Sequence, residues 1–75
     1  MKVAIYPGTF DPITNGHLDI ILRATKFVDR LVIAVSNNNK KETLFDTNER
    51  VEMIKKVIKD QNISNVETDY FDGLL

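Results

Sequence analysis

Cysteine is absent from the 75 residues of this sequence, which excludes disulfide bonds and thiolate metal sites. A chain of this length buries only about 60 % of the surface that its unfolded form exposes. Without covalent or metal cross-links we therefore expect one small domain of marginal stability. Hydrophobic residues make up 43 % of the chain and charged residues 28 %, which is the balance of an ordered globular protein.

Long hydrophobic runs are also missing. No apolar stretch approaches the roughly 20 residues that a membrane-spanning helix needs, and no signal-peptide pattern follows Met1-Lys2. We therefore expect no membrane partner and a cytoplasmic location. The net charge of −1 argues against a nucleic-acid partner, so any anionic ligand must be held by local groups rather than by a basic surface.

Short apolar runs predict three β-strands. Residues 3–6 and 31–35 are continuous apolar runs, as in strands buried on both faces of a parallel sheet. Residues 66–71 alternate between apolar and polar side chains, which predicts a third strand.

Between these runs, apolar residues follow helical spacing. After Gly16 they fall at i, i+3, i+4 and i+7, which predicts a first helix with a stripe of Leu18, Ile21, Leu22 and Thr25. Asp46, followed three residues later by Glu49, has the pattern of a capping box and predicts the start of a second helix. The apolar stripe of that helix consists of Val51, Ile54, Val57 and Ile58.

The order strand, helix, strand, helix, strand predicts an α/β fold with a Rossmann-like parallel sheet, wound to one side of its first strand. Such a βαβαβ unit is half of a doubly wound nucleotide-binding domain. Ligands of these sheets bind beyond the carboxyl ends of the strands, where the winding reverses; here that point is the loop after the first strand. Because the sequence stops on Leu74-Leu75 without a polar tail, we expect residues 1–75 to be the amino-terminal half of a single, truncated domain.

The loop after the first strand, residues 6–17, contains groups suited to a phosphate. Gly8 can take backbone shapes closed to other residues and lets a ligand approach the main chain. Thr9 offers a hydroxyl, and Gly16 leaves room at a helix start, where unpaired N–H groups favour anions. His17 lies in the first turn of that helix. Neither G-x-G-x-x-G nor G-x-x-x-x-G-K-[ST] occurs, so this is neither of the two familiar phosphate loops.

Residues 14–17, Thr-Asn-Gly-His, resemble the T/H-x-G-H signature of the nucleotidyltransferase superfamily. Residues 7–12, Pro-Gly-Thr-Phe-Asp-Pro, are similar to bacterial phosphopantetheine adenylyltransferases. Nicotinate mononucleotide adenylyltransferases and glycerol-phosphate cytidylyltransferases usually have histidine at the position of Thr14, so this threonine favours the phosphopantetheine family. Further similarity lies at Lys40-Lys41, Glu49-Arg50 and residues 73–75.

The resemblance implies transfer of AMP from ATP to 4'-phosphopantetheine, giving dephospho-coenzyme A and pyrophosphate in coenzyme A biosynthesis. It also implies Mg²⁺ bound with ATP and a homohexamer. The family's later ATP-binding segments are missing here, so we expect an incomplete site and little or no activity from residues 1–75 alone. Two alternatives stay open: another small-molecule nucleotidyltransferase, acting on nicotinate mononucleotide or glycerol phosphate, and a fragment that binds nucleotide without turnover.

The resemblance also assigns residues near the first helix. His17 is expected to donate to the ATP phosphates and stabilise the transition state; its alternative role is only to satisfy the helix start. The main chain of Thr9 and Phe10 is expected to contact ATP. The Thr9 hydroxyl would orient the acceptor phosphate, unless it serves only a local turn.

Later residues are expected to bind the acceptor. Lys41 would reach its phosphate as a flexible point charge, although Lys40 could take that role or both could be solvated loop lysines. Leu74 and Leu75 would line the pantetheine arm, with ordinary core packing as the alternative.

Three further features receive structural roles rather than ligand contacts. We expect Asp11 to fix the turn before Pro12 through its own backbone bonds, and Arg50 to pair with an acidic neighbour at the helix start. The polar, aperiodic residues 37–42 should form a mobile surface loop.

Overall fold

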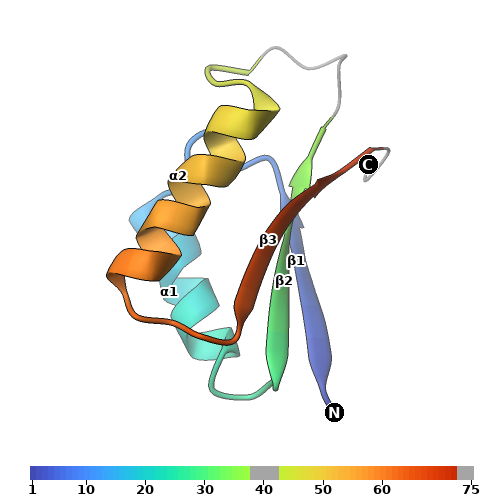
Figure 1. Cartoon of the computed structure of the whole chain (residues 1–75), viewed down its shortest axis with the longest axis vertical. Coiled ribbons are helices and arrows are strands. Elements are labelled where there is room, and N and C mark those ends of the chain that lie inside the picture. The colour runs from blue at the N-terminus through green and yellow to red at the C-terminus, as the bar shows by residue number, and fades with distance from the viewer. Residues whose placement is uncertain (38–42, 73–75) are drawn as a thin grey trace.

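The computed structural model describes residues 1–37 and 43–72. These residues form three strands and two helices in alternation (Figure 1). The elements are β1 (Val3–Gly8), α1 (Asn15–Ala24), β2 (Arg30–Ser36), α2 (Thr47–Asp60) and β3 (Val66–Phe71). The predicted order of elements is therefore confirmed, with boundaries shifted by one or two residues.

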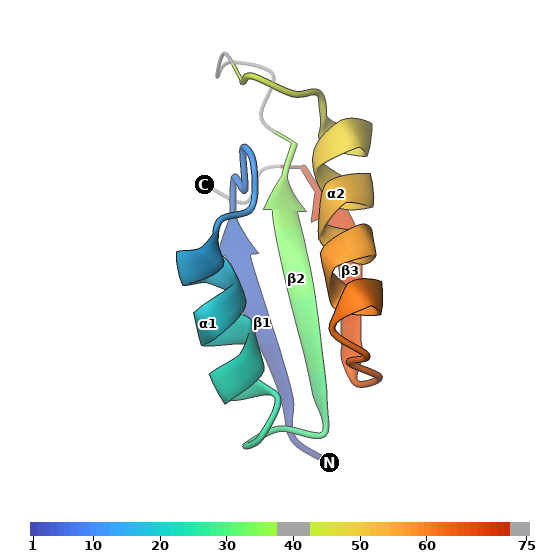
Figure 2. The same cartoon turned by 90° about the vertical axis from the view of Figure 1, so that its left-hand side faces the viewer.

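The three strands form one parallel sheet in the order β1-β2-β3. Both helices cover the same face of this sheet, as the two views in Figures 1 and 2 show. Because the strands are parallel, their carboxyl ends lie at one edge, together with the loop that leads into α1 and the start of α2. The predicted Rossmann-like α/β fold, wound to one side of its first strand, is confirmed.

Strand β1 runs two residues further than predicted, through Pro7 and Gly8. Proline cannot donate to a sheet ladder, so it is tolerated mainly in edge strands. Within the described residues β1 is such an edge, since it pairs only with β2. Pro7, which follows the apolar residues 3–6, is therefore compatible with β1 continuing to Gly8.

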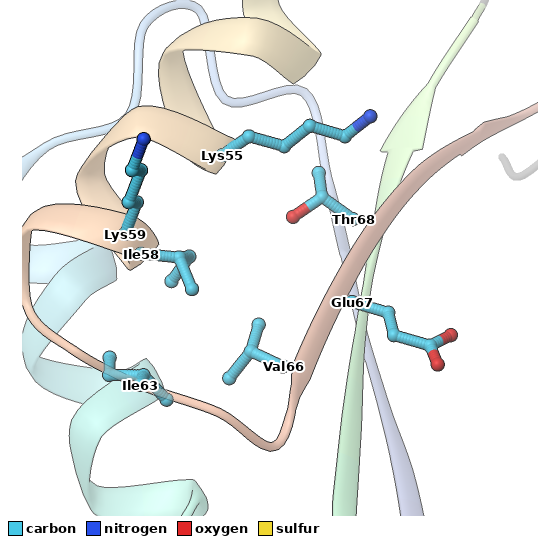
Figure 3. Close-up of a pocket in the computed structure, with 7 residues that line it drawn as sticks. All are labelled: Lys55, Ile58, Lys59, Ile63, Val66, Glu67 and Thr68. Carbon is cyan, nitrogen blue, oxygen red and sulfur yellow. The ribbon is translucent and has the colours of Figure 1, made fainter.

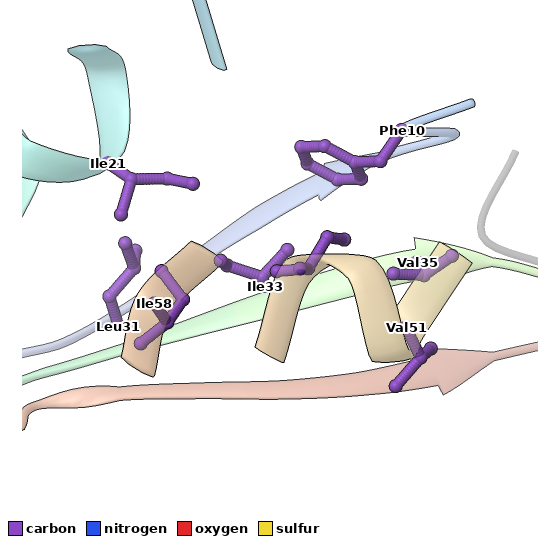
Figure 4. Packing of buried hydrophobic residues seen from close by; sticks show 8 residues of the cluster. Phe10, Ile21, Leu31, Ile33, Val35, Val51 and Ile58 are labelled. Atoms are coloured by element: carbon purple, nitrogen blue, oxygen red, sulfur yellow. The ribbon is translucent and has the colours of Figure 1, made fainter. Parts of the chain in front are cut away.

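The core lies between the helices and the sheet. Ile21 of α1, Ile33 of β2 and Ile54 of α2 have no exposed surface. Figure 4 shows how side chains from both helices meet those of β2, with Phe10 packed over one end of the cluster. The predicted stripe of α2 is largely confirmed, because Val51, Ile54 and Ile58 are all buried.

The opposite face of the sheet is uncovered in the described residues. Val3 is 51 % exposed and Ile5 is 65 % exposed, so the prediction that the first strand is buried on both faces is wrong for this structure. The reason is that no described helix packs on that side.

Arg30 of β2 and Glu67 of β3 form an ion pair between neighbouring strands. Glu67 raises the pKa of Arg30 by hydrogen bonding and charge attraction.

Both helices begin with a capping box. The Asp46 side chain accepts from the Glu49 N–H at 2.8 Å, and the Glu49 side chain accepts from the Asp46 N–H at 3.3 Å. This box satisfies two donors that a helix start otherwise leaves unpaired, and it confirms the predicted start of α2. In the part of the chain that the structure describes, neither helix is long and apolar enough to cross a membrane.

Candidate functional site

The start of α1 presents His17 at the carboxyl edge of the sheet. Thr14 caps the helix, and its side chain accepts from the His17 N–H at 3.3 Å. The His17 ring reaches back, and its Nδ1 accepts from the Thr14 N–H at 3.0 Å. The histidine therefore takes the place that glutamate or glutamine usually has in a capping box.

This arrangement determines which ring nitrogen of His17 can donate. A nitrogen that accepts a hydrogen bond carries no proton, so the neutral imidazole has its proton on Nε2. Among the described residues, none accepts a hydrogen bond from Nε2. The helix-start role and the ligand role of His17 are thus compatible, because each uses a different nitrogen.

Aromatic contacts hold the His17 ring in place. Its centroid lies 4.8 Å from that of Phe10 and 6.3 Å from that of Tyr6, and the Tyr6 and Phe10 rings meet edge to face at 5.1 Å. Phe10 is 2 % exposed. The Phe10 ring therefore packs in the core and supports the histidine, and the predicted main-chain contact with ATP stays a prediction.

Gly8 and Gly16, which lie on either side of the loop between β1 and α1, differ in what their missing side chains permit. A Cβ at Gly8 would lie 2.9 Å from Cε2 of the Phe10 ring, so this glycine makes room for a buried side chain. A Cβ at Gly16 would meet only Thr14 Oγ1, at the ordinary contact distance of 3.6 Å. Nothing described in the chain itself requires glycine at position 16, which fits a role in admitting a ligand.

Within the described residues Arg50 pairs with no acidic neighbour at the helix start, so that prediction is wrong. Arg50 is 3 % exposed, and its four hydrogen bonds to described residues go to neutral oxygens: the carbonyls of Phe45, Thr9 and Ser36 and the Thr47 hydroxyl. Among residues 1–37 and 43–72, no carboxylate forms an ion pair with it. The reason is that the Arg50 side chain is buried among backbone carbonyls of β2 and the neighbouring loops. Buried carbonyls need hydrogen-bond donors, and Arg50 supplies them.

Asp11 also departs from its predicted role. Its carboxylate accepts from the Leu44 N–H at 2.6 Å and the Phe45 N–H at 2.9 Å, rather than from its own turn. The two donors lie 33 and 34 residues along the chain. Asp11 therefore ties the loop after β1 to the segment before α2, and both of its oxygens are used in doing so.

The sequence held one overlooked signal for Arg50. A cation in the first turn of a helix faces the positive end of the helix dipole, which is unfavourable. Such a residue needs a compensating use, and here it has four acceptors. Asp11 gave no comparable signal, because its partners are main-chain groups of a distant loop.

Thr9 lies between these elements, half-buried in the loop after β1. Its carbonyl accepts from Arg50 at 2.9 Å. The predicted ligand residues Thr9, Phe10 and His17 are therefore gathered at one edge of the sheet. Lys40, Lys41, Leu74, Leu75 and most of the predicted mobile loop lie outside the described residues.

Two hollows mark the surface beside α2. One of about 580 Å³ lies between α2 and the amino end of β3, lined by residues that include Lys55, Lys59 and Thr68 (Figure 3). A second, of about 350 Å³, lies at the carboxyl edge and is lined by Asn37, Asp46, Thr47, Asn48 and Tyr70. Only the second is at the same edge of the sheet as the predicted ligand residues.

The groups around His17 are suited to an anion rather than a cation. Imidazole N–H, hydroxyl and backbone N–H groups are hydrogen-bond donors that favour phosphate oxygens. Within the described ranges no group of three His, Cys, Asp or Glu residues could hold a metal ion.

A sequence profile described as cytidylyltransferase-like matches residues 5–74. The chain belongs to this family. Over all 75 residues it is 57 % identical to a phosphopantetheine adenylyltransferase of Caldanaerobacter subterraneus subsp. tengcongensis, 59 % to one of Clostridium beijerinckii and 61 % to one of Clostridium botulinum. In each case the match spans 46 % of the relative's length. The resemblance read from the loop after β1 thus extends along the whole chain.

Solved structures support the fold of this cytidylyltransferase-like chain. A NadR protein in complex with NR superposes with a TM-score of 0.81 at 20 % identity, over 93 % of this chain and 20 % of its own. A bifunctional NMN adenylyltransferase/ADP ribose pyrophosphatase from Francisella tularensis, complexed with AMP and a Mn ion, superposes with a TM-score of 0.81 at 22 % identity, over 96 % of this chain and 23 % of its own. At these identities the likeness establishes the fold alone.

Proposed function

We propose that the complete product of the gene encoding these residues is a phosphopantetheine adenylyltransferase. It would transfer AMP from ATP to 4'-phosphopantetheine, with release of pyrophosphate and formation of dephospho-coenzyme A in coenzyme A biosynthesis. Relatives with that name are 57 to 61 % identical to the chain. Because the chain spans about half of their length, we propose that residues 1–75 are the amino-terminal part of a single nucleotidyltransferase domain.

The observation that carries the proposal is the geometry of His17. Its Nδ1 is engaged by Thr14 at 3.0 Å, which leaves Nε2–H as a donor at a helix start. Backbone N–H groups and the helix dipole favour phosphate at the same place. A preorganised donor of this kind stabilises charge that develops on phosphate oxygens during transfer.

The proposed step needs no covalent enzyme intermediate. An oxygen of the acceptor phosphate attacks the α-phosphorus of ATP in line, a new phosphorus–oxygen bond forms, and the bond to the β-phosphate breaks to release pyrophosphate. His17 would donate to the phosphate oxygens as that bond breaks. Main-chain groups of Thr9 and Phe10 would hold ATP, and the Thr9 hydroxyl would orient the acceptor phosphate.

Further parts of the proposal rest on the resemblance alone. Lys41, or Lys40 in its place, would bind the acceptor phosphate, and Leu74 and Leu75 would line the pantetheine arm. Mg²⁺ would accompany ATP and neutralise phosphate charge when bound. The complete protein would be a cytoplasmic homohexamer.

A rival function within the same family is transfer to a different acceptor. The chain matches a cytidylyltransferase-like profile, and one solved structure of similar fold is a bifunctional NMN adenylyltransferase/ADP ribose pyrophosphatase. Thr14 stands against this rival, because those families usually have histidine there.

Pyrophosphate release by the complete gene product tests the proposal. ATP is supplied with 4'-phosphopantetheine, nicotinate mononucleotide or glycerol phosphate in separate reactions, and CTP replaces ATP in a parallel set. We expect release with ATP and 4'-phosphopantetheine only. Release with another acceptor would favour the rival, and nucleotide binding without release in any reaction would favour a binding role.

A further inference from the structure

The buried guanidinium of Arg50 joins segments that meet at the proposed nucleotide site. Its Nη1 donates to the carbonyls of Thr9 at 2.9 Å and Ser36 at 3.0 Å, and its Nε donates to the carbonyl of Phe45 at 3.1 Å. These oxygens belong to the loop after β1, the last residue of β2 and the segment before α2. A planar group with five fixed donors can serve all three carbonyls at once.

The bond to Thr9 sets the direction of the next N–H group. The Thr9 carbonyl and the Phe10 N–H belong to one planar peptide unit, and this peptide is trans, since the cis bond in this loop is Asp11-Pro12. In a trans peptide the two groups point in opposite directions. Because Arg50 binds the carbonyl, the Phe10 N–H points away from Arg50, and no described residue accepts a hydrogen bond from it.

The Phe10 backbone needs such support. Its φ is 50°, a left-handed conformation that is costly for a bulky residue and persists only when the surroundings impose it. The ring is held in the core, 2 % exposed. On one side Arg50 holds the Thr9 carbonyl, and on the other the Asp11 carboxylate is held by the Leu44 and Phe45 N–H groups.

We infer that Arg50 is a positioning residue that fixes the Thr9–Phe10 peptide with its N–H turned toward the ATP phosphates. The inference rests on the proposed function and extends it to a residue that does not touch the ligand. An N–H with little access to water and no described partner gains from an incoming anionic acceptor. Arg50 would thus preorganise a donor, and its role depends on geometry more than on charge.

Replacement by lysine separates geometry from charge. In the complete gene product, Arg50→Lys keeps the cation but cannot reach three carbonyls in one plane. We expect kcat/KM for ATP to fall about tenfold or more, since small misplacement of a binding group is costly. The matched control is Arg23→Lys, which alters an exposed arginine paired with Asp19 on α1 and should leave kcat/KM unchanged. A folded Arg50→Lys protein with kcat/KM within twofold of wild type would overturn the inference.

Amide NMR of the wild-type protein gives a second test that needs no variant to fold. On titration with MgATP, we expect the Phe10 amide proton to shift together with those of Gly16 and His17. Shifts at Gly16 and His17 with an unmoved Phe10 amide would overturn the inference while leaving the proposed function standing. If none of the three moves and no pyrophosphate is released, the proposed function fails and the inference fails with it.

Discussion

Gly8 is the last residue of β1 and Gly16 lies in the first turn of α1, and the structure predicts opposite effects for their replacement by alanine. In Gly8→Ala, the new Cβ would lie 2.9 Å from Cε2 and 3.1 Å from Cζ of the Phe10 ring. That ring is buried and contacts Tyr6 and His17, so it cannot move without disturbing its neighbours. Overpacking of this kind typically costs about 1 to 3 kcal/mol of stability.

In Gly16→Ala, the new Cβ meets only Thr14 Oγ1 at 3.6 Å. Position 16 lies in the first turn of α1, where alanine is favoured over glycine by up to about 1 kcal/mol. We therefore expect equal or greater stability. If Gly16 admits the ATP phosphates, the same methyl group should raise KM for ATP.

Urea unfolding and steady-state kinetics of both variants test this contrast. We expect Gly8→Ala to unfold at lower urea than wild type, and Gly16→Ala to unfold at the same or higher urea with at least a several-fold higher KM for ATP. Normal ATP kinetics in a stable Gly16→Ala protein would refute the assignment of Gly16 to the ligand. Normal stability of Gly8→Ala would refute the packing argument.

Two further predictions concern the loops at this edge. Asp11→Ala leaves the Leu44 and Phe45 N–H groups without their acceptor, so it should lower the free energy of unfolding in urea by about 2 kcal/mol or more. The control Asp19→Ala breaks an exposed ion pair and should have little effect. Equal effects of the two variants would contradict the role of Asp11 in joining the loops. Lys41→Ala should raise KM for 4'-phosphopantetheine more than KM for ATP in the complete gene product, with Lys40→Ala measured in parallel, and a change in the ATP constant alone would show that the lysine serves the other ligand.

Local patterns were sufficient to predict the elements of the fold. The capping box of Asp46 and Glu49 needs only residues three apart, and it forms as expected. The strands and helices follow from apolar periodicity, which is also a local property. The uncovered face of the sheet was missed because burial of β1 depends on what packs against it and not on its own sequence.

The supports of the site could not be predicted in the same way. Arg50 and the Thr9 carbonyl are 41 residues apart, and the acceptor is a main-chain group that any residue would provide. The Asp11 carboxylate likewise binds backbone N–H groups. Gly8 was assigned to a ligand, yet its closest constraint is the Phe10 ring two residues later, whose position follows from a left-handed backbone that sequence seldom reveals.

His17 is the residue on which the functional account depends, and its two roles can be separated. His17→Ala removes both the capping bond to Thr14 and the Nε2 donor. His17→Gln offers a side chain that completes a capping box in the usual way, but it lacks the imidazole. Thermal melting should therefore show the glutamine variant closer to wild type than the alanine variant, with a loss of about 1 kcal/mol for the missing cap.

The most direct measurement is kcat for pyrophosphate release by wild type, His17→Ala and His17→Gln in the complete gene product, with ATP and 4'-phosphopantetheine saturating. Loss of one preorganised donor typically costs about 3 kcal/mol, or roughly a hundredfold in turnover. We expect both variants to lose about that much kcat while KM for each substrate stays within an order of magnitude. A folded His17→Ala protein with near-normal kcat would contradict the account and reduce His17 to the cap of α1.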